Sequence, residues 1–152
     1  MGALPGCNQY SGIHSSTIGA KMARAAAAPP KLTAASHRET QMQFALFGAG
    51  RAGWVHARNI ANHADAELSH VYDVDGSASR RMVAALGGKV AETPEEIWAA
   101  GAVDAVLVAS STNTHIDVMR GAMRAGKAIY CEKPIDLDLA KARTFAVEAR
   151  DA

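Results

Sequence analysis

Three glycines with the spacing Gly-x-Gly-x-x-Gly follow a short apolar run near the middle of the chain. They are Gly48, Gly50 and Gly53, with Arg51 and Ala52 between the last two. Between a strand and a helix, the first glycine allows a tight turn and the second lets a pyrophosphate approach the backbone. The third lets the helix pack closely, so that its free N–H groups face the phosphates. These five residues predict a dinucleotide site, although a plain turn uses the same glycines.

An acidic residue stands where such a site needs a partner for the ribose. Asp73 follows Gly53 by twenty residues, at the end of the second predicted strand. Its carboxylate accepts hydrogen bonds from ribose hydroxyls and repels a 2′-phosphate, which favours NAD over NADP. Val74 offers no phosphate clamp, whereas Arg80 and Arg81 weaken the preference. The alternative is that Asp73 only begins an Asp-Val-Asp-Gly turn.

A polar loop follows the fourth predicted strand. Ser110, Thr112 and Asn113 belong to it. In an open α/β sheet, ligands bind beyond the carboxyl ends of the strands where the strand order reverses, here between the first and fourth strands. We expect the loop to face the cofactor, and it can also cap the next helix. His115, in the first turn of that helix, either approaches the nicotinamide or lies on the surface.

A lysine follows the fifth predicted strand in the sequence Glu132-Lys133-Pro134. The proline biases Lys133 toward an extended conformation and ends the strand. An ammonium held beside the ligand crevice could donate a hydrogen bond to a substrate hydroxyl, or stabilise its oxygen as it becomes a carbonyl. Taken in isolation, a lysine is more often a solvated surface residue.

Residues 42–152 alternate short apolar runs with longer amphipathic segments. This pattern predicts βαβ units and an α/β fold with a doubly wound parallel sheet, the Rossmann arrangement. We expect a helix start at Thr93, which would be an N-cap followed by proline and two acids. The run at 105–109 is apolar throughout and is expected to be buried on both faces. Strands are expected near 44–47, 68–72, 89–91, 105–109 and 128–130, and helices near 51–61, 77–86, from 94, from 114 and 137–150.

Composition narrows the functional classes. The chain has 152 residues, is 49% hydrophobic and carries a net charge of +1, so it has no strong electrostatic preference for nucleic acid or membrane. Its longest apolar stretch, 99–109, is interrupted by Asp104 and is too short to span a bilayer. Cys7 and Cys131 are too few for a disulfide framework or a zinc site. We therefore expect no metal and a reducing, cytoplasmic setting.

Residues 1–41 differ from the rest of the chain. They are rich in Ala, Ser, Gly and Pro, show no sustained period, and contain four basic residues against one acidic residue. We expect a disordered extension, or a start assigned too early, because Met42 directly precedes the first strand. A transit peptide is the other interpretation, since such segments are also poor in acids.

Several motifs together resemble the Gfo/Idh/MocA oxidoreductases over residues 42–152. The matching segments are 48–53 with a following histidine at 56, 72–75, 103–106, 112–115 and 131–135. The resemblance implies NAD(H)-dependent oxidation of a hydroxyl of a cyclic polyol or sugar to a ketone. Asp73 would match the family's ribose-binding acid and Lys133 its active-site lysine, with Glu132 and Lys133 both beside the cofactor.

One departure from the family concerns its second α/β domain, which carries the catalytic Asp and His and forms the oligomer. The chain has no counterpart of it, so we expect a truncated fold that binds a dinucleotide without efficient turnover, and a longer form that is a homo-oligomer. Two other hypotheses stay open. One is a stand-alone dinucleotide-binding or redox-sensing module, and the other is a nucleotide-free scaffold whose glycines serve only as turns.

Overall fold

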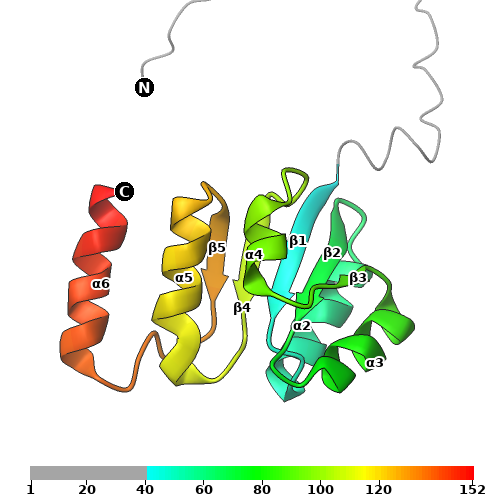
Figure 1. The fold of residues 1–152 in the computed structure, drawn as a ribbon, viewed down its shortest axis with the longest axis horizontal. Helices are drawn as coiled ribbons and strands as arrows, with labels where there is room; N and C mark the ends of the chain where they lie inside the picture. Colours follow the sequence, from blue (N-terminus) through cyan, green and yellow to red (C-terminus); the bar gives the residue numbers. More distant parts are fainter. Residues whose placement is uncertain (1–40) are drawn as a thin grey trace, which may run out of the picture. The chain divides into compact units, whose positions relative to one another are not determined.

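A computed structural model describes residues 41–152. The predictions for the N-terminal extension, and Cys7, lie outside the described residues. Five parallel strands form one sheet in the order β3-β2-β1-β4-β5 (Figure 1). This order confirms the predicted doubly wound sheet, with its reversal between β1 and β4. The elements are β1 Met42–Phe47, α2 Arg51–Ala61, β2 Ala66–Tyr72, α3 Gly76–Leu86, β3 Lys89–Val90, α4 Pro94–Ala99, β4 Ala105–Val108, the 3₁₀ turn η1 Thr112–Thr114, α5 His115–Arg124, β5 Ala128–Cys131 and α6 Leu139–Asp151.

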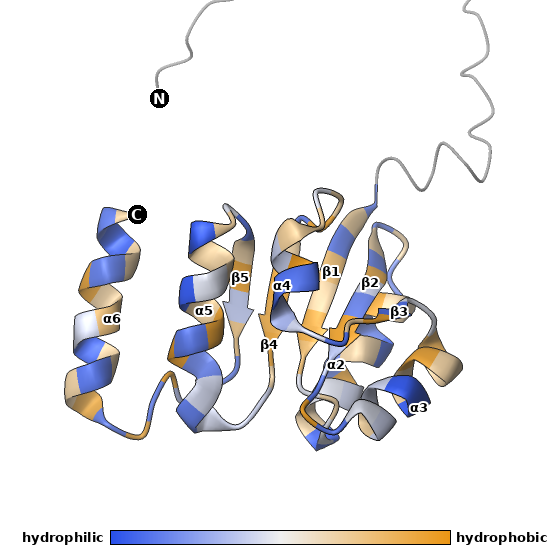
Figure 2. Ribbon diagram, viewed as in Figure 1, coloured by the Kyte–Doolittle hydropathy of each residue, from blue (hydrophilic) through white to orange (hydrophobic). Residues whose placement is uncertain are grey.

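The two faces of the sheet carry separate apolar clusters, because neighbouring residues of a strand point to opposite faces. Leu46 and Leu107 pack with residues of α2 and α3, whereas Phe47, Val106 and Val108 pack with residues of α4, α5 and α6. All four residues of β4 are buried, as its apolar sequence predicts. Figure 2 shows β4 as an apolar strand, and it lies between β1 and β5 in the sheet. The site at its end therefore rests on a rigid scaffold.

An aromatic stack lies beneath the carboxyl end of β1. The ring of Trp98 stacks on that of Phe47, with centroids 5.0 Å apart and planes 13° apart. Tyr72 meets Phe47 from β2 in a tilted arrangement at 5.4 Å. Gly121 makes room for the stack, since a Cβ there would stand 2.6 Å from the Trp98 ring. These contacts fix the position of Phe47, which lines the crevice described below.

Helix starts are where the structure departs most from the sequence predictions. Thr93 occupies the N-cap of α4, but its side chain makes no capping hydrogen bond. Glu96 instead accepts from the backbone N–H of Glu92 at 3.2 Å. The last helix begins at 139 rather than 137, because the Asp138 carboxylate caps it, accepting from the N–H of Ala140 at 2.8 Å.

Helix α6 is held on α5 by an ion pair and an apolar contact. Arg120 donates from Nε and Nη2 to the two carboxylate oxygens of Glu148, at 2.8 Å each. The hydrogen bonds from Arg120 lower the pKa of Glu148, and burial only partly opposes this. Phe145 of α6 is buried in the same cluster as Met119 of α5. These contacts hold α6 in place, and α6 follows the segment that carries Lys133.

Ser79 provides a test of packing in α3. The residue is fully buried, and its Oγ has no hydrogen-bond partner within residues 41–152. A buried hydroxyl without a partner costs about 1–3 kcal/mol, and alanine is also the better helix former. We expect Ser79→Ala to raise the free energy of unfolding by about 1 kcal/mol and the Tm by roughly 4–8 °C. Thermal unfolding followed by circular dichroism measures this.

Ser77 is the matched control in the same helix. Its hydroxyl donates to Asp75 Oδ1 at 2.6 Å and accepts from Arg81 at 2.8 Å, so Ser77→Ala removes bonds that are satisfied. The Ser77 variant should not gain stability. An unchanged or lowered Tm for Ser79→Ala would show that the buried hydroxyl carries no penalty.

Candidate functional site

The first and third glycines of the loop after β1 are required by the backbone itself. Gly48 has φ of +100°, and a Cβ there would stand 2.5 Å from the backbone of Ala109 and Ser110. A Cβ on Gly53 would overlap the carbonyl oxygen of Gly48. The predicted roles in the tight turn and in close helix packing are therefore confirmed. The loop can follow this path only with glycine at both positions.

Gly50 differs from its two neighbours because its surroundings are empty. No heavy atom lies within 4 Å of the position of a Cβ, and the backbone has ordinary extended angles. Gly50 is the N-cap of α2, and no side chain accepts a hydrogen bond from that helix end. The first N–H groups of a helix lack intrahelical partners and attract anions. The open space over an uncapped helix end fits a pyrophosphate.

Asp73 lies at the end of β2 and contacts the glycine loop directly. Its Oδ2 accepts from the N–H of Ala49 at 2.6 Å, and its Oδ1 accepts from the N–H of Asp75 at 2.8 Å. The second bond is the turn that the alternative interpretation predicted. A carboxylate has about four lone-pair sites, so both oxygens can still accept from ribose hydroxyls. The turn and the ribose contact are therefore compatible.

A crevice of about 300 Å³ opens at the point where the strand order reverses. Gly48, Asp73 and Ser110 come to it from the ends of β1, β2 and β4. This is where open α/β sheets bind their ligands. Apolar side chains of Phe47, Tyr72, Val74, Pro94 and Val118 supply much of the wall, with Ser111, Thr114 and Asp117 completing it. Such a lining suits a nucleotide, whose flat base can pack on the apolar side chains while its polar groups bind the polar residues.

The polar loop after β4 reaches the crevice only in part. Ser110 lines it, whereas Thr112 and Asn113 are absent from its walls. The expected helix cap is wrong, because no side chain of the loop accepts from the first N–H groups of α5. The hydroxyls instead bond to each other and to the loop, Ser110 Oγ to Thr114 Oγ1 at 2.8 Å and Thr114 Oγ1 to the Ser111 carbonyl at 2.7 Å.

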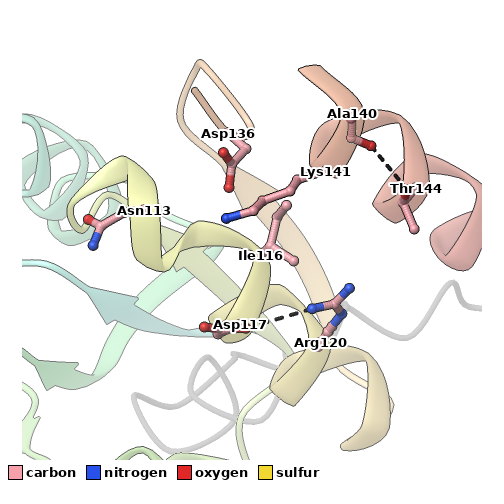
Figure 3. Close-up of a pocket in the computed structure, with 8 residues that line it drawn as sticks. All are labelled: Asn113, Ile116, Asp117, Arg120, Asp136, Ala140, Lys141 and Thr144. Atoms are coloured by element: carbon pink, nitrogen blue, oxygen red, sulfur yellow. Dashed lines mark hydrogen bonds and ion pairs between the residues drawn. The ribbon is translucent and has the colours of Figure 1, made fainter. Parts of the chain in front are cut away.

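Asn113 belongs to a second hollow, of about 380 Å³, between α5 and α6 (Figure 3). Asp117 and Arg120 of α5 line it and form an ion pair at 3.7 Å. Asp136 and Lys141 line it from the segment before α6 and from α6 itself. Acidic and basic side chains both line this hollow, so its electrostatic potential favours neither an anionic nor a cationic ligand. The cofactor contact of Thr112 and Asn113 stays a prediction.

His115 lies inside the protein. Its residue is 1% exposed, so the alternative that placed it on the surface is wrong. Its Nδ1 lies 3.0 Å from the carbonyl oxygen of Pro134, and its Nε2 lies 3.0 Å from that of Ser110. The ring therefore joins the loop after β4 to the segment after β5. Contact with the nicotinamide stays a prediction.

Glu132 meets a residue that sequence reasoning did not assign to the site. His56 of α2 donates from Nε2 to Glu132 Oε1 at 2.5 Å. This hydrogen bond is the main cause of a pKa of Glu132 below its usual value, and burial opposes it. The His56 ring also packs edge-on against Tyr130, with centroids 5.5 Å apart. The histidine that follows the glycine loop was the signal in the sequence, but its partner lies 76 residues away.

Lys133 is exposed at the carboxyl edge of the sheet, directly after β5. Within residues 41–152 its ammonium has no hydrogen bond or ion pair, and it lies outside the walls of the crevice. No helix in this part of the chain has the length and apolar character to cross a membrane. The described residues also bring no three His, Cys, Asp or Glu side chains together as a metal site.

Comparison with known proteins decides the family. Residues 42–152 match the model of the Gfo/Idh/MocA proteins, described as an oxidoreductase family with an NAD-binding Rossmann fold. The chain belongs to this family. An inositol 2-dehydrogenase of Rhizobium meliloti strain 1021 is 45% identical over 102 residues, which are 67% of this chain and 31% of that protein. Membership makes the described domain an NAD-binding domain and overturns the nucleotide-free scaffold.

Solved structures agree with this assignment. A myo-inositol dehydrogenase of Corynebacterium glutamicum aligns with a TM-score of 0.68 and 38% identity, over 73% of this chain and 33% of that one. A Lactobacillus casei myo-inositol dehydrogenase, in complex with NAD(H) and myo-inositol, aligns with a TM-score of 0.70 and 25% identity, over 74% and 34%. The chain thus spans about a third of the relatives it matches. An oxidoreductase is favoured over a stand-alone module.

Proposed function

We propose that this chain is the NAD-binding part of a dehydrogenase that oxidises a ring hydroxyl of a cyclic polyol, of the myo-inositol type, to a ketone. The observation that supports it best is the crevice at the strand-order reversal, where the glycine loop and Asp73 meet. The relatives named as inositol dehydrogenases support the substrate class. Bound NAD would accept the hydride from the carbon that bears the hydroxyl.

The residues of this chain contribute binding and positioning. The N–H groups at the start of α2 bind the pyrophosphate, and Gly50 leaves room for its approach. Asp73 holds Ala49 of the loop and accepts from the ribose hydroxyls. Lys133 donates a hydrogen bond to the substrate oxygen and stabilises negative charge on it. The ammonium suits this role because it is exposed and, among residues 41–152, its charge interacts with the neighbouring Glu132 carboxylate without forming an ion pair.

The proposal extends to the cellular compartment and the oligomeric state of the whole protein. The cofactor and a soluble sugar-like substrate favour the cytoplasm, as does the half-buried free thiol of Cys131. Burial and the nearby Glu132 raise the pKa of that thiol to about 11, so it is unreactive at neutral pH. We further propose that the longer relatives' second domain has a counterpart that makes the enzyme a homo-oligomer.

A titration of the 152-residue chain with NADH tests the cofactor site through Asp73. We expect Asp73→Asn to weaken NADH binding by about 10–100-fold, because the amide has one accepting oxygen in place of two. The preference for NADH over NADPH should also fall, since the charge that repels a 2′-phosphate is gone. NADH fluorescence measures both affinities.

Asp75 is the control for damage to the turn. It caps α3, where Oδ1 accepts from the N–H of Ser77 at 2.9 Å, and it does not line the crevice. Asp75→Asn should keep the wild-type affinity for NADH. Wild-type affinity in Asp73→Asn would contradict the proposed ribose contact. A folded wild-type chain that does not bind NADH would contradict the proposed cofactor site in this chain.

The substrate class needs the enzyme as its source cells make it. An antibody raised against residues 42–152 captures that enzyme, and the absorbance of NADH reports its activity. We expect NADH to form with NAD and myo-inositol, and to form more slowly with glucose. Activity with glucose alone would reject the inositol assignment but keep the dehydrogenase.

A further inference from the structure

The backbone around Lys133 is held by side chains from two helices that lie on opposite faces of the sheet. On one side, Glu132 receives the hydrogen bond of His56 from α2. On the other side, the carbonyl oxygen of Pro134 lies 3.0 Å from Nδ1 of His115, which belongs to α5. Lys133 is the residue between these two attachment points. Its own side chain has no partner among residues 41–152 that could fix it.

The His115 contact has little freedom to change. The ring is almost completely buried, and both of its nitrogens face carbonyl oxygens at 3.0 Å. A carbonyl only accepts, so each contact needs a donating ring nitrogen, and a neutral ring donates to one carbonyl at a time. A hydrogen bond to Pro134 therefore requires the proton on Nδ1, whereas the proton on Nε2 would bond Ser110 instead.

The His56 contact secures the other end from the opposite face. The side chains of His56 and Glu132 are 18% and 28% exposed, so water screens their interaction only in part. The lowered pKa of Glu132 agrees with a carboxylate that is stabilised as an anion by this donor. Tyr130 packs against the His56 ring and limits its rotation. The N–H of Glu132 also donates to Val108 of β4 at 2.9 Å, which ties the segment to the sheet.

We propose that His56 and His115 are positioning residues, which together hold the backbone of Lys133 at the carboxyl edge of the sheet. The consequence for catalysis rests on the proposed function, in which Lys133 meets the substrate. The tether itself is a property of the chain without cofactor. Lys133 can then be presented on a short segment between β5 and α6, without an ion pair that would compete with the substrate.

Backbone ¹⁵N relaxation of the 152-residue chain without cofactor tests the tether. The order parameter of the Lys133 amide should be about 0.85 in the wild type, as for rigid backbone, and should fall toward 0.6 when either histidine becomes methionine. Glutamine has nearly the same length as methionine but keeps an N–H donor. His115→Gln and His56→Gln should therefore retain more of the order than the methionine variants do. His63→Gln, at an exposed residue after α2, is the control and should match the wild type.

Two results of the relaxation experiment would overturn the proposal. Wild-type order in both methionine variants would overturn the proposal. Equal loss in the glutamine and methionine variants would also overturn it, because volume and not the hydrogen bond would then hold the segment. If His115→Met does not fold, the comparison of His56→Met with His56→Gln tests the proposal, because His56 is only half-buried. Failure of the wild-type chain to bind NADH would contradict the proposed function and leave the relaxation result standing.

Discussion

Gly53→Ala should destabilise the protein by about 3 kcal/mol or more and lower the Tm by roughly 10 °C or more. The added Cβ would overlap the carbonyl oxygen of Gly48, which is backbone and cannot rotate away. Relief requires α2 to move away from β1, which opens the apolar cluster on that face of the sheet. Chemical and thermal unfolding measure the loss.

Gly101 provides the control for this substitution. It lies in the turn after α4, has nothing within 4 Å of its Cβ position, and has no positive φ. Gly101→Ala should change the free energy of unfolding by no more than about 0.5 kcal/mol. A Tm for Gly53→Ala within about 2 °C of the wild type would mean that helix and strand do not need this close approach.

Gly50→Ala should strongly weaken cofactor binding while it leaves the fold intact. The Cβ would enter open space, and the backbone angles suit alanine. Alanine is a poorer N-cap than glycine, but it also lowers the entropy of the unfolded chain by a similar amount, so the net change in stability is about zero. The methyl group would stand where the pyrophosphate approaches the N–H groups of α2. We expect the Kd for NADH to rise at least about 100-fold.

Adenosine separates this effect from a general loss of the site. It has the base and the ribose of NADH but no pyrophosphate, so its binding should be nearly equal in the wild type and in Gly50→Ala. NMR titration measures the weak adenosine affinity, and fluorescence measures that of NADH. Unchanged NADH affinity in Gly50→Ala would remove the helix N-terminus from the proposed cofactor site.

The fold and the glycine loop could be predicted because their causes are local in sequence. The apolar run of β4 requires burial on both faces, and alternating strands and helices require a parallel sheet. Gly53 is constrained by Gly48 and Leu46, which are close in sequence, whereas the atoms that constrain Gly48 belong to Ala109 and Ser110, just after β4. Helix starts were less predictable, since Thr93 and Asp138 are both common N-cap residues and only the Asp138 side chain makes a capping hydrogen bond.

The environment of the histidines could not be predicted. His115 begins a helix, where a surface position was as reasonable as a buried one. It is buried and faces the carbonyl of Pro134, 19 residues further along the chain. His56 finds Glu132 at a separation of 76 residues. Neither contact has a local period or spacing that would reveal it.

The sequence by itself determined the family, the doubly wound sheet and the loop that fits a pyrophosphate, because these depend on residue types at fixed short spacings. The tertiary structure alone decided how the Lys133 segment is held. That arrangement arises where α2 and α5 pack on opposite faces of one sheet and bring His56 and His115 to the end of β5. Contacts between distant segments follow from packing geometry, which no single stretch of sequence contains.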